Sequence, residues 1–134
     1  MSGADEVRDD RRYTKDHEWA REDGPEVLVG VTAFAVDQLG DVTLVALDVK
    51  VGDVVEAGKP FGAIESVKTV SDLFAPVSGK VTRLNDRLDT APELVNEDPW
   101  EAAWMLAISP SALAEERERL LDASSYRRLI AEAH

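Results

Sequence analysis

Residues 61–75 read FGAIESVKTVSDLFA, and this stretch decides the fold. Two runs rich in β-branched and aromatic residues, Phe61–Ile64 and Thr69–Ala75, flank the polar tetrad Glu65–Lys68. This pattern predicts a β-hairpin with Lys68 at or near its tip. The tetrad contains no Asn-Gly or Gly-X pair of the kind that normally makes a two-residue turn, so we expect neighbouring strands to hold the hairpin in shape.

Lys68 is the reactive group that this hairpin displays. A lysine that acts as a nucleophile needs burial or nearby cations, whereas Glu65 and Asp72 favour its charged form. Lys68 therefore suits the role of an acceptor that another enzyme recognises and acylates. Most lysines on turns are simply solvated charges, so the residues around Lys68 must decide between the two interpretations.

The sequence around Lys68 closely resembles the lipoyl-lysine segment of the glycine cleavage system H protein family. The matching motifs lie in collinear order over about residues 13–131: Tyr13–Trp19, Leu39–Val42, Glu65–Val81 and Glu93–Pro99. The resemblance implies that Lys68 carries lipoic acid in amide linkage. It also implies a mainly β fold, a barrel-sandwich hybrid (a flattened, lipoyl-domain-like barrel) with a short internal helix and two C-terminal helices.

A shuttle function follows from the same resemblance. Lipoyl-Lys68 would accept the aminomethyl group of glycine from a pyridoxal-phosphate-dependent glycine decarboxylase and present it to a tetrahydrofolate-dependent aminomethyltransferase. Dihydrolipoamide dehydrogenase would then reoxidise the arm, and a lipoate ligase or a lipoyl or octanoyl transferase would attach it. The sequence has no glycine-rich nucleotide motif, no Gly-x-Ser-x-Gly and no companion ligands for His17 or His134, so it predicts a carrier rather than an enzyme, without a metal site.

Two interpretations of Glu18 stay open. In a plain strand, Trp19 points inward and Glu18 is solvated. The resemblance implies instead that the loaded arm folds back into a cleft whose carboxylates hold the amine, with Glu18 as the leading cleft residue. Asp72 is the second candidate, and Glu65, beside the lysine, is included in the same predicted site.

Departures from the family pattern leave an alternative open. The family usually shows Asp-Pro-Tyr-Gly-x-Gly-Trp where residues 98–104 read DPWEAAW, and Thr-Asp where this chain has Thr32-Ala33. Because loss of glycine can change a loop that needs a positive φ, a divergent H-like paralogue that serves another enzyme system is the competing hypothesis. A 2-oxoacid dehydrogenase lipoyl domain would read Asp-Lys-Ala and a biotin carrier Met-Lys-Met, and Val67-Lys68-Thr69 matches neither.

Bulk composition limits the partners. With 134 residues, a net charge of −12 and a pI near 4.5, the chain predicts one acidic domain that binds neither nucleic acid nor an anionic membrane surface. It has no cysteine and no apolar run near the roughly 20 residues of a membrane span. Residues 1–12 mix acidic and basic side chains without an apolar segment, so we expect a disordered tail, a lipoyl-carrier domain over 13–134 and a cytoplasmic location.

Turn and capping signals predict the remaining elements. Residues 86–99 are polar and turn-rich, and the similar pieces 51–54 and 78–81 suggest two half-units that pack as a small sandwich. The predicted strands are 17–21, 26–31, 41–47 and 102–108, and the predicted helices are 32–39, 109–121 and a final helix with the apolar stripe Tyr126, Leu129, Ile130 and Ala133.

Overall fold

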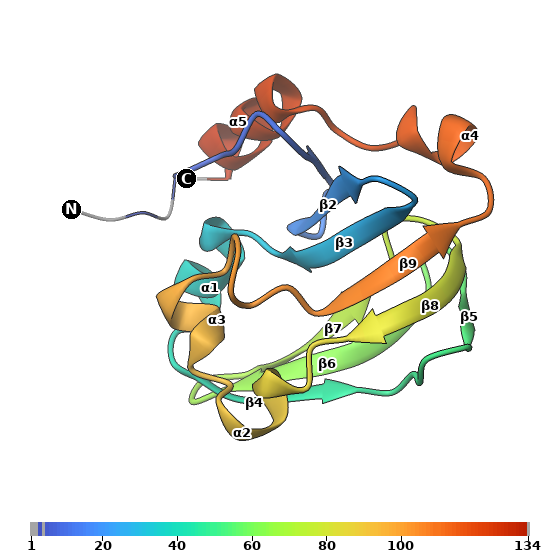
Figure 1. The fold of residues 1–134 in the computed structure, drawn as a ribbon. Helices are drawn as coiled ribbons and strands as arrows, with labels where there is room; N and C mark the ends of the chain where they lie inside the picture. The colour runs from blue at the N-terminus through green and yellow to red at the C-terminus, as the bar shows by residue number, and fades with distance from the viewer. Residues whose placement is uncertain (1–2, 4, 134) are drawn as a thin grey trace.

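Two antiparallel β-sheets pack face to face in the computed structural model, which describes residues 3 and 5–133 (Figure 1). The larger sheet has six strands in the order β1-β2-β3-β9-β8-β5, and the smaller has three in the order β4-β6-β7. The strands are β1 Arg12–Tyr13, β2 Glu18–Asp23, β3 Glu26–Val31, β4 Val42–Leu47, β5 Val54–Val55, β6 Pro60–Ser66, β7 Val70–Phe74, β8 Gly79–Leu84 and β9 Leu106–Pro110. The mainly β fold predicted from the sequence is confirmed.

Short helices lie at the ends of the sheets. The first, α1, begins after Thr32, whose hydroxyl oxygen accepts a hydrogen bond from the amide of Ala35 at 3.2 Å, and it ends at Gly40, whose φ is 78°. Both caps were predicted from the sequence. The helices are α1 Ala33–Leu39, α2 Arg87–Thr90, α3 Leu94–Glu97, α4 Leu113–Arg117 and α5 Ala123–Glu132.

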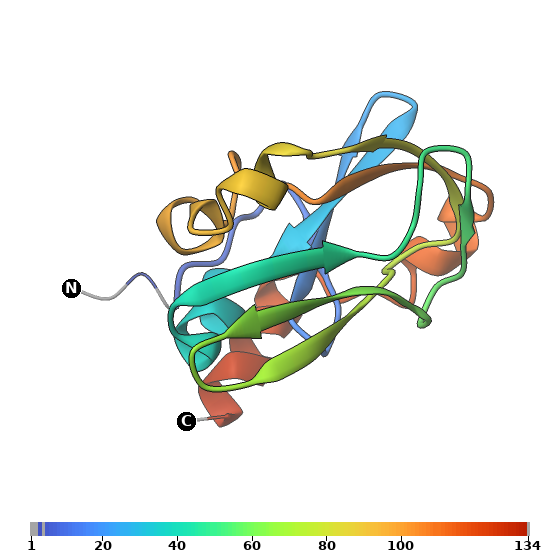
Figure 2. The ribbon, with the colours of Figure 1, turned by 90° about the horizontal axis from the view of Figure 1, so that it is seen from below.

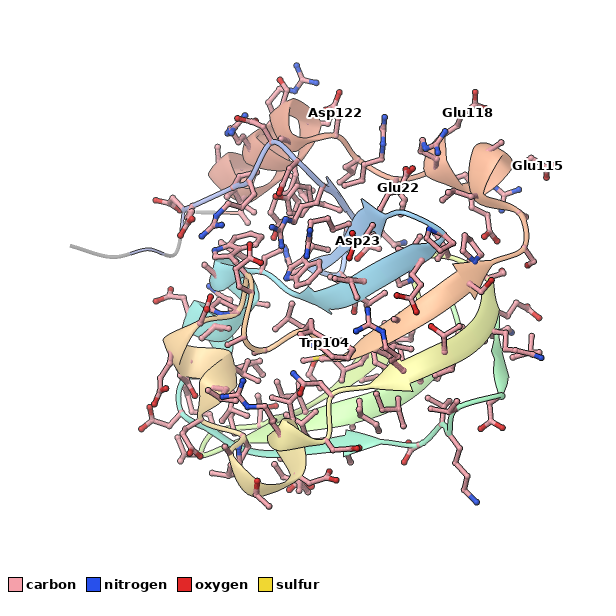
Figure 3. The ribbon with its side chains drawn as sticks, in the orientation of Figure 1. Glu22, Asp23, Trp104, Glu115, Glu118 and Asp122 are labelled. Carbon is pink, nitrogen blue, oxygen red and sulfur yellow. The ribbon has the colours of Figure 1, made fainter. Side chains whose placement is uncertain are left out.

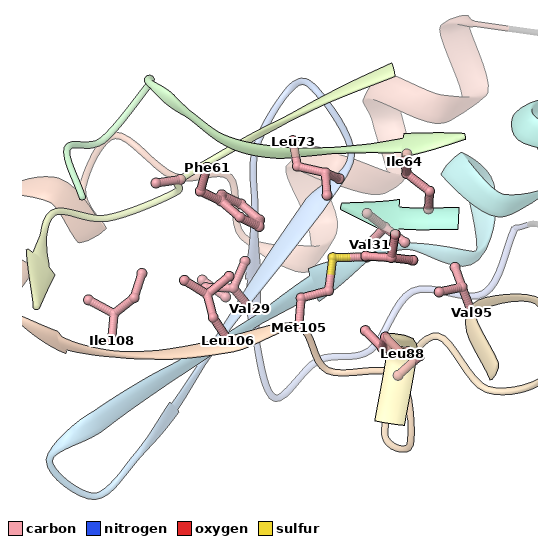
Figure 4. Close-up of a cluster of buried hydrophobic side chains, with 14 of the residues drawn as sticks. Val29, Val31, Phe61, Ile64, Leu73, Leu88, Val95, Met105, Leu106 and Ile108 are labelled. Atoms are coloured by element: carbon pink, nitrogen blue, oxygen red, sulfur yellow. The ribbon is translucent and has the colours of Figure 1, made fainter. Parts of the chain in front are cut away.

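The main core fills the space between the two sheets (Figure 4). Both sheets contribute fully buried apolar side chains, among them Val29, Phe61, Ile64, Leu73, Met105 and Leu106. Burial of each such side chain stabilises the fold by roughly 1.5–3 kcal/mol. The Lys68 hairpin, formed by β6 and β7, therefore rests on the core through the inner faces of its own strands.

The final helix, α5, packs on the other side of the large sheet (Figure 1). Its Tyr126 ring stacks on the ring of Tyr13 with 4.4 Å between centroids, and Ile130 is also buried. Of the predicted stripe, Leu129 is half-buried and Ala133 is exposed. The predicted helix is confirmed, and its buried residues join a second, smaller apolar cluster.

The two similar pieces of sequence pair with each other. Val54 lies opposite Lys80 and Val55 opposite Gly79, and the amide of Val81 donates to the carbonyl of Asp53 at 2.8 Å. The half-units therefore meet along the β5–β8 edge of the large sheet.

The chain from residue 86 onward differs from the sequence prediction in three places. The predicted strand over 102–108 begins only at Leu106 and runs to Pro110. The predicted helix over 109–121 is wrong at both ends, because Ser109 and Pro110 continue β9 and pair with β8, residues 118–121 follow the helix, and only Leu113–Arg117 is helical. Strand pairing satisfies the backbone of Ser109 better than a short exposed helix would. Residues 86–99, predicted as turns, contain the four-residue helices α2 and α3.

The N-terminal segment bears on where the domain begins. Arg11 is buried and donates to the carbonyl of Trp100 at 2.8 Å, and Arg12 belongs to β1. The described packing therefore starts before Tyr13, the predicted boundary. Residues 1, 2 and 4 of the predicted tail, and His134, lie outside the described residues, and the division into tail and domain stays a prediction.

Acidic side chains lie around α4, on the β2–β3 hairpin and just before α5 (Figure 3). Those labelled there are exposed: Glu22 and Asp23 of the β2–β3 hairpin, and Glu115, Glu118 and Asp122. Over residues 3 and 5–133, none of the helices is both long and apolar enough to cross a membrane.

Candidate functional site

Lys68 occupies the two-residue turn between β6 and β7. The amide of Ser66 donates to the carbonyl of Thr69 at 2.8 Å, so Val67 and Lys68 are the central residues of the turn. Tight hairpins normally use a turn with positive φ, but neither central residue has one. Instead the Ser66 hydroxyl oxygen accepts from the amides of Lys68 and Thr69, both at 3.2 Å.

A neighbouring segment completes the turn, as the sequence predicted. The amide of Val67 donates at 3.0 Å to the carbonyl of Asp41, which lies between α1 and β4. Figure 2 shows the β6–β7 hairpin and β4 side by side in the small sheet. The side chain of Asn96 in α3 bridges the residues on either side of Asp41: its Nδ2 donates to the Gly40 carbonyl at 2.9 Å and its Oδ1 accepts from the Val42 amide at 2.8 Å. Asn96 thus fixes the backbone that holds the Lys68 turn.

Gly40 leaves room for the stem of Lys68. A Cβ at this position would lie 2.9 Å from Cε of Lys68, and the φ of 78° and ψ of −150° belong to a region used almost only by glycine. Gly40 therefore ends α1 and also lets the flexible stem of Lys68 pass close to its backbone. The sequence predicts only the first role of Gly40, and it predicts no role for Asn96, whose partners are far away along the chain.

Glu18 is buried, and the solvated interpretation is wrong. Its side chain is 1% exposed, one carboxylate oxygen accepts from the hydroxyl of Thr14 at 2.6 Å, and the other accepts from the amide of Phe74 at 3.2 Å. Burial raises the pKa of the Glu18 carboxyl to about 7, although the two hydrogen bonds oppose this shift. A carboxyl with such a pKa responds strongly to a cation placed beside it.

A cleft connects the Lys68 turn with Glu18. Its cavity of about 200 Å³ begins at Thr69, the residue after Lys68, and extends to Glu18 between the edge strand β7 and the face formed by α1 and β2. The walls are apolar at Val31, Ala35, Leu39, Ile64 and Leu73, and the acidic residues Asp16, Glu18 and Asp72 are also among the lining residues. This combination suits an extended apolar arm with a cationic end.

Two of the three predicted cleft residues line this cavity. Glu18 closes it, and Asp72 lies on its exposed rim. Glu65 is not among the cavity-lining residues; it pairs with Leu44 on one side and Val70 on the other, in a row across the outer face of the small sheet. Glu65 thus lies half-buried on the outer face of the small sheet, near Lys68, and its place in the predicted site stays a prediction.

The altered loop before β9 has an ordinary backbone. Neither Glu101 nor Ala103, which replace the family's glycines, has a positive φ, and Ala103 is buried with its amide donating to the Asp98 carbonyl at 3.1 Å. The Glu101 carboxylate pairs with Arg11 at 3.2 Å and Arg8 at 3.5 Å.

The end of the loop is packed as well. Trp104 lies beside β8, with the Arg83 guanidinium 5.0 Å from its ring (Figure 3). The loop therefore replaces glycine flexibility with packing and ion pairs.

The fold and the site together define a carrier. They display one lysine on a hairpin beside an acid-lined cleft, and within the described part of the chain no group of His, Asp and Glu side chains is arranged to hold a metal ion.

Comparison with known proteins identifies the class of carrier. A profile of the glycine cleavage H-protein family matches residues 11–133. The chain is 51% identical over 127 residues to the glycine cleavage system H protein of Anaeromyxobacter sp. (strain K), covering 95% of this chain and 98% of that one. It is 50% identical over 121 residues to the same protein of Halalkalibacterium halodurans, covering 90% and 93%.

A solved structure agrees with these relatives. The crystal structure of a glycine cleavage system H protein from Mycobacterium marinum superposes with a TM-score of 0.84 at 40% identity, covering 93% of this chain and 99% of that one. The chain belongs to the glycine cleavage H-protein family, whose members are lipoyl carriers of the glycine cleavage system and work with its other proteins.

Proposed function

We propose that Lys68 is the lysine that carries the lipoyl group. The observation that carries the proposal is the cleft that begins beside Lys68 and ends at the buried Glu18 carboxylate. The apolar walls fit the hydrocarbon part of a lipoyl arm, and the carboxylates fit an ammonium at its end. When bound, the lipoyl group supplies a disulfide that takes up the aminomethyl group of glycine and later gives it to a folate-dependent acceptor.

The residues of the chain hold the loaded arm away from water. Glu18 in its ionised form pairs with the ammonium, a charge-assisted hydrogen bond that is stronger than a neutral one. Burial raises the pKa of the Glu18 carboxyl, and pairing with the ammonium lowers it again. The cation therefore keeps Glu18 charged at neutral pH. Asp72 at the rim adds a second negative charge, and the apolar walls exclude water from a group that water can hydrolyse.

The proposed partners act at different distances from the turn. Glycine decarboxylase, aminomethyltransferase and dihydrolipoamide dehydrogenase act at the end of the arm, whereas a lipoate ligase or a lipoyl or octanoyl transferase must reach the Lys68 amine itself. The ligase or transferase that attaches the arm must therefore contact the surface around Val67 and Val70, which are 69% and 62% exposed. The acidic composition favours basic partner surfaces, and a cytoplasmic location stays our prediction.

An exchange assay tests the proposed function. Lipoylated protein, mixed with glycine decarboxylase from its own organism, should support exchange of labelled bicarbonate into the carboxyl group of glycine, and the unmodified protein should not. Lys80→Arg is the matched control for Lys68→Arg, since Lys80 is also an exposed lysine but lies on strand β8, away from the turn. If a fully lipoylated protein is inert with that decarboxylase, the assignment fails in favour of a divergent carrier for another system.

A further inference from the structure

His17 has an unusual backbone conformation for a residue with a side chain. It alone among the described non-glycine residues has a positive φ, 72°. Its amide donates to the carbonyl of Thr14 at 3.1 Å, so residues 15–17 form a three-residue hairpin loop that ends in the left-handed position where glycine is usual. Glycine would adopt this conformation without strain, and in His17 the contacts of the imidazole offset the strain.

The imidazole is fixed by the C-terminal helix. Its Nδ1 lies 2.8 Å from the Tyr126 hydroxyl of α5, and its ring lies 4.7 Å from the ring of Phe34 in α1. The Tyr126 hydroxyl lies in turn 2.7 Å from the hydroxyl of Thr32, the N-cap of α1. One chain of hydrogen bonds thus joins α5, α1 and the turn that precedes Glu18.

The direction of this chain sets the tautomer of His17. Thr32 is fully buried, and its oxygen already accepts from the amide of Ala35. Among the described residues, the Tyr126 oxygen is the acceptor that lies within reach of the Thr32 hydroxyl, so Thr32 donates to Tyr126. The Tyr126 hydroxyl in turn donates to Nδ1 of His17. The reverse direction would leave the buried Thr32 hydroxyl without an acceptor, which is costly.

This assignment places the proton of His17 on Nε2. His17 lines the cleft together with Asp16, Glu18 and Asp72, and the described residues make no hydrogen bond to Nε2 of its ring. Burial lowers the pKa of His17 although Asp16 opposes the shift, so the ring is neutral at neutral pH. A neutral ring has one N–H, and here it remains available to a molecule in the cleft.

We propose that His17 donates a hydrogen bond from Nε2 to the seated lipoyl arm, at an acceptor atom of the arm beside its loaded end. The inference rests on the proposed function and extends it, because Glu18 recognises the positive charge whereas His17 recognises a neutral or sulfur acceptor of the same arm. The left-handed residue lets the turn place His17 and Glu18, which are neighbours in sequence, in the lining of one cleft.

The tautomer can be tested without any cofactor. Nitrogen-15 NMR of the His17 ring in the unmodified protein should show a protonated Nε2 and an unprotonated Nδ1 at pH 7. Tyr126→Phe should remove this preference, because it deletes the hydroxyl that holds Nδ1 and keeps the ring that stacks on Tyr13. A protonated Nδ1 in the unmodified wild-type protein would overturn the proposal.

The contact can be tested in the loaded protein. Attachment and aminomethylation of the arm should shift the Nε2–H resonance and slow its exchange with water at least several-fold. His17→Gly should keep the turn, since glycine suits its φ, and should speed hydrolysis of the loaded arm several-fold, with Tyr126→Phe giving a smaller increase. An Nε2–H that is unchanged by loading, or a His17→Gly protein that protects the arm as well as wild type, contradicts the proposal.

Failure of the proposed function gives a different pattern. An arm that is unprotected in the wild-type protein, and equally unprotected in Glu18→Gln, shows that the arm does not use the cleft. In that case the tautomer assignment can stand, but the contact with the arm is refuted along with the function.

Discussion

Two hairpin turns line one cleft and are built in opposite ways. The turn at Ser66–Thr69 has ordinary φ values, is held by a hydroxyl and by a neighbouring segment, and exposes Lys68. The turn at Thr14–Glu18 has a residue with positive φ, is anchored to the C-terminal helix, and buries Glu18. The comparison shows that a fixed, exposed turn is enough to display Lys68 to other proteins. To bind a cation, by contrast, the Glu18 carboxyl must be buried, and burying a carboxylate costs free energy.

The largest effect is expected at the exposed turn. Lys68→Arg should abolish lipoylation and bicarbonate exchange, because a guanidinium cannot form the amide. The melting temperature should stay within about a degree of wild type, since an exposed side chain buries little apolar area. Lys80→Arg and Lys59→Arg should keep full activity, and lipoate found on either residue by peptide mapping would refute the assignment.

At the buried turn, Glu18→Gln should weaken function strongly. The variant loses a charge-assisted bond of about 1.5–3 kcal/mol, so hydrolysis of the loaded arm should be roughly 10- to 100-fold faster. Equal hydrolysis rates in the two proteins would show that Glu18 does not hold the amine.

Relative to wild type, Glu18→Gln should gain stability as the pH rises. The folded-state pKa of Glu18, about 7, lies above its ordinary value of 4.5, so the folded protein binds this proton more tightly than the unfolded chain. The free energy of unfolding of wild type should therefore fall as pH rises from about 4.5 to 7, by about 3 kcal/mol from this group. Denaturation of both proteins at pH 5 and pH 8 measures the effect, and an advantage of Glu18→Gln that is the same at both pH values would contradict it.

Gly40→Ala should shift the lysine while Gly52→Ala should not. Both glycines have positive φ, 78° and 100°, so both substitutions should destabilise the fold, by about 1–2 kcal/mol or more. Only the Cβ at residue 40 would meet Lys68, since nothing lies within 4 Å of a Cβ at residue 52. Lipoylation by the ligase should be several-fold slower in Gly40→Ala alone, and equal slowing in both variants would mean that strain, not the path of the lysine, is responsible.

A smaller effect is expected on the outer face of the Lys68 hairpin. Leu44 and Val70 flank Glu65 and are 42% and 62% exposed, so an enzyme that covers the turn should bury them. Leu44→Ser with Val70→Ser should raise the KM for lipoylation a few-fold and leave bicarbonate exchange by the fully lipoylated protein unchanged. Val54→Ser, which changes a valine that is 77% exposed on β5, is the control. A KM that rises equally in the control would show that this face is not recognised.

The smallest effect is expected in the altered loop. Glycine at residues 101 and 103 should not increase exchange, because the present residues have no positive φ and Ala103 is well packed. Loss of the Glu101 ion pairs and of the Ala103 side chain should lower stability by about 1–2 kcal/mol. A clear gain in exchange would show that the loop had limited the contact with the decarboxylase.

Local patterns in the sequence predicted the parts of the site that are local. A few neighbouring residues determine each of these parts: the Lys68 hairpin, the caps of α1 and the apolar stripe that contains Tyr126. The burial of Glu18 could not be read in this way, because its partner Phe74 is far away in sequence and the turn depends on a left-handed histidine. The sequence places Pro110 at the start of a helix, whereas the structure has it at the end of β9, because pairing with β8 outweighs the local helix signal.

Titration of the Glu18 carboxyl in the unloaded and the loaded protein tests the central claim most directly. Carbon-13 NMR of the labelled side chain should show a pKa near 7 in the lipoylated, unloaded protein, as burial requires. Aminomethylation should lower that pKa by at least one unit, because the ammonium seated in the cleft favours the ionised form. An identical titration curve before and after loading, in a protein whose arm is fully loaded, would show that the arm does not bring its charge to Glu18.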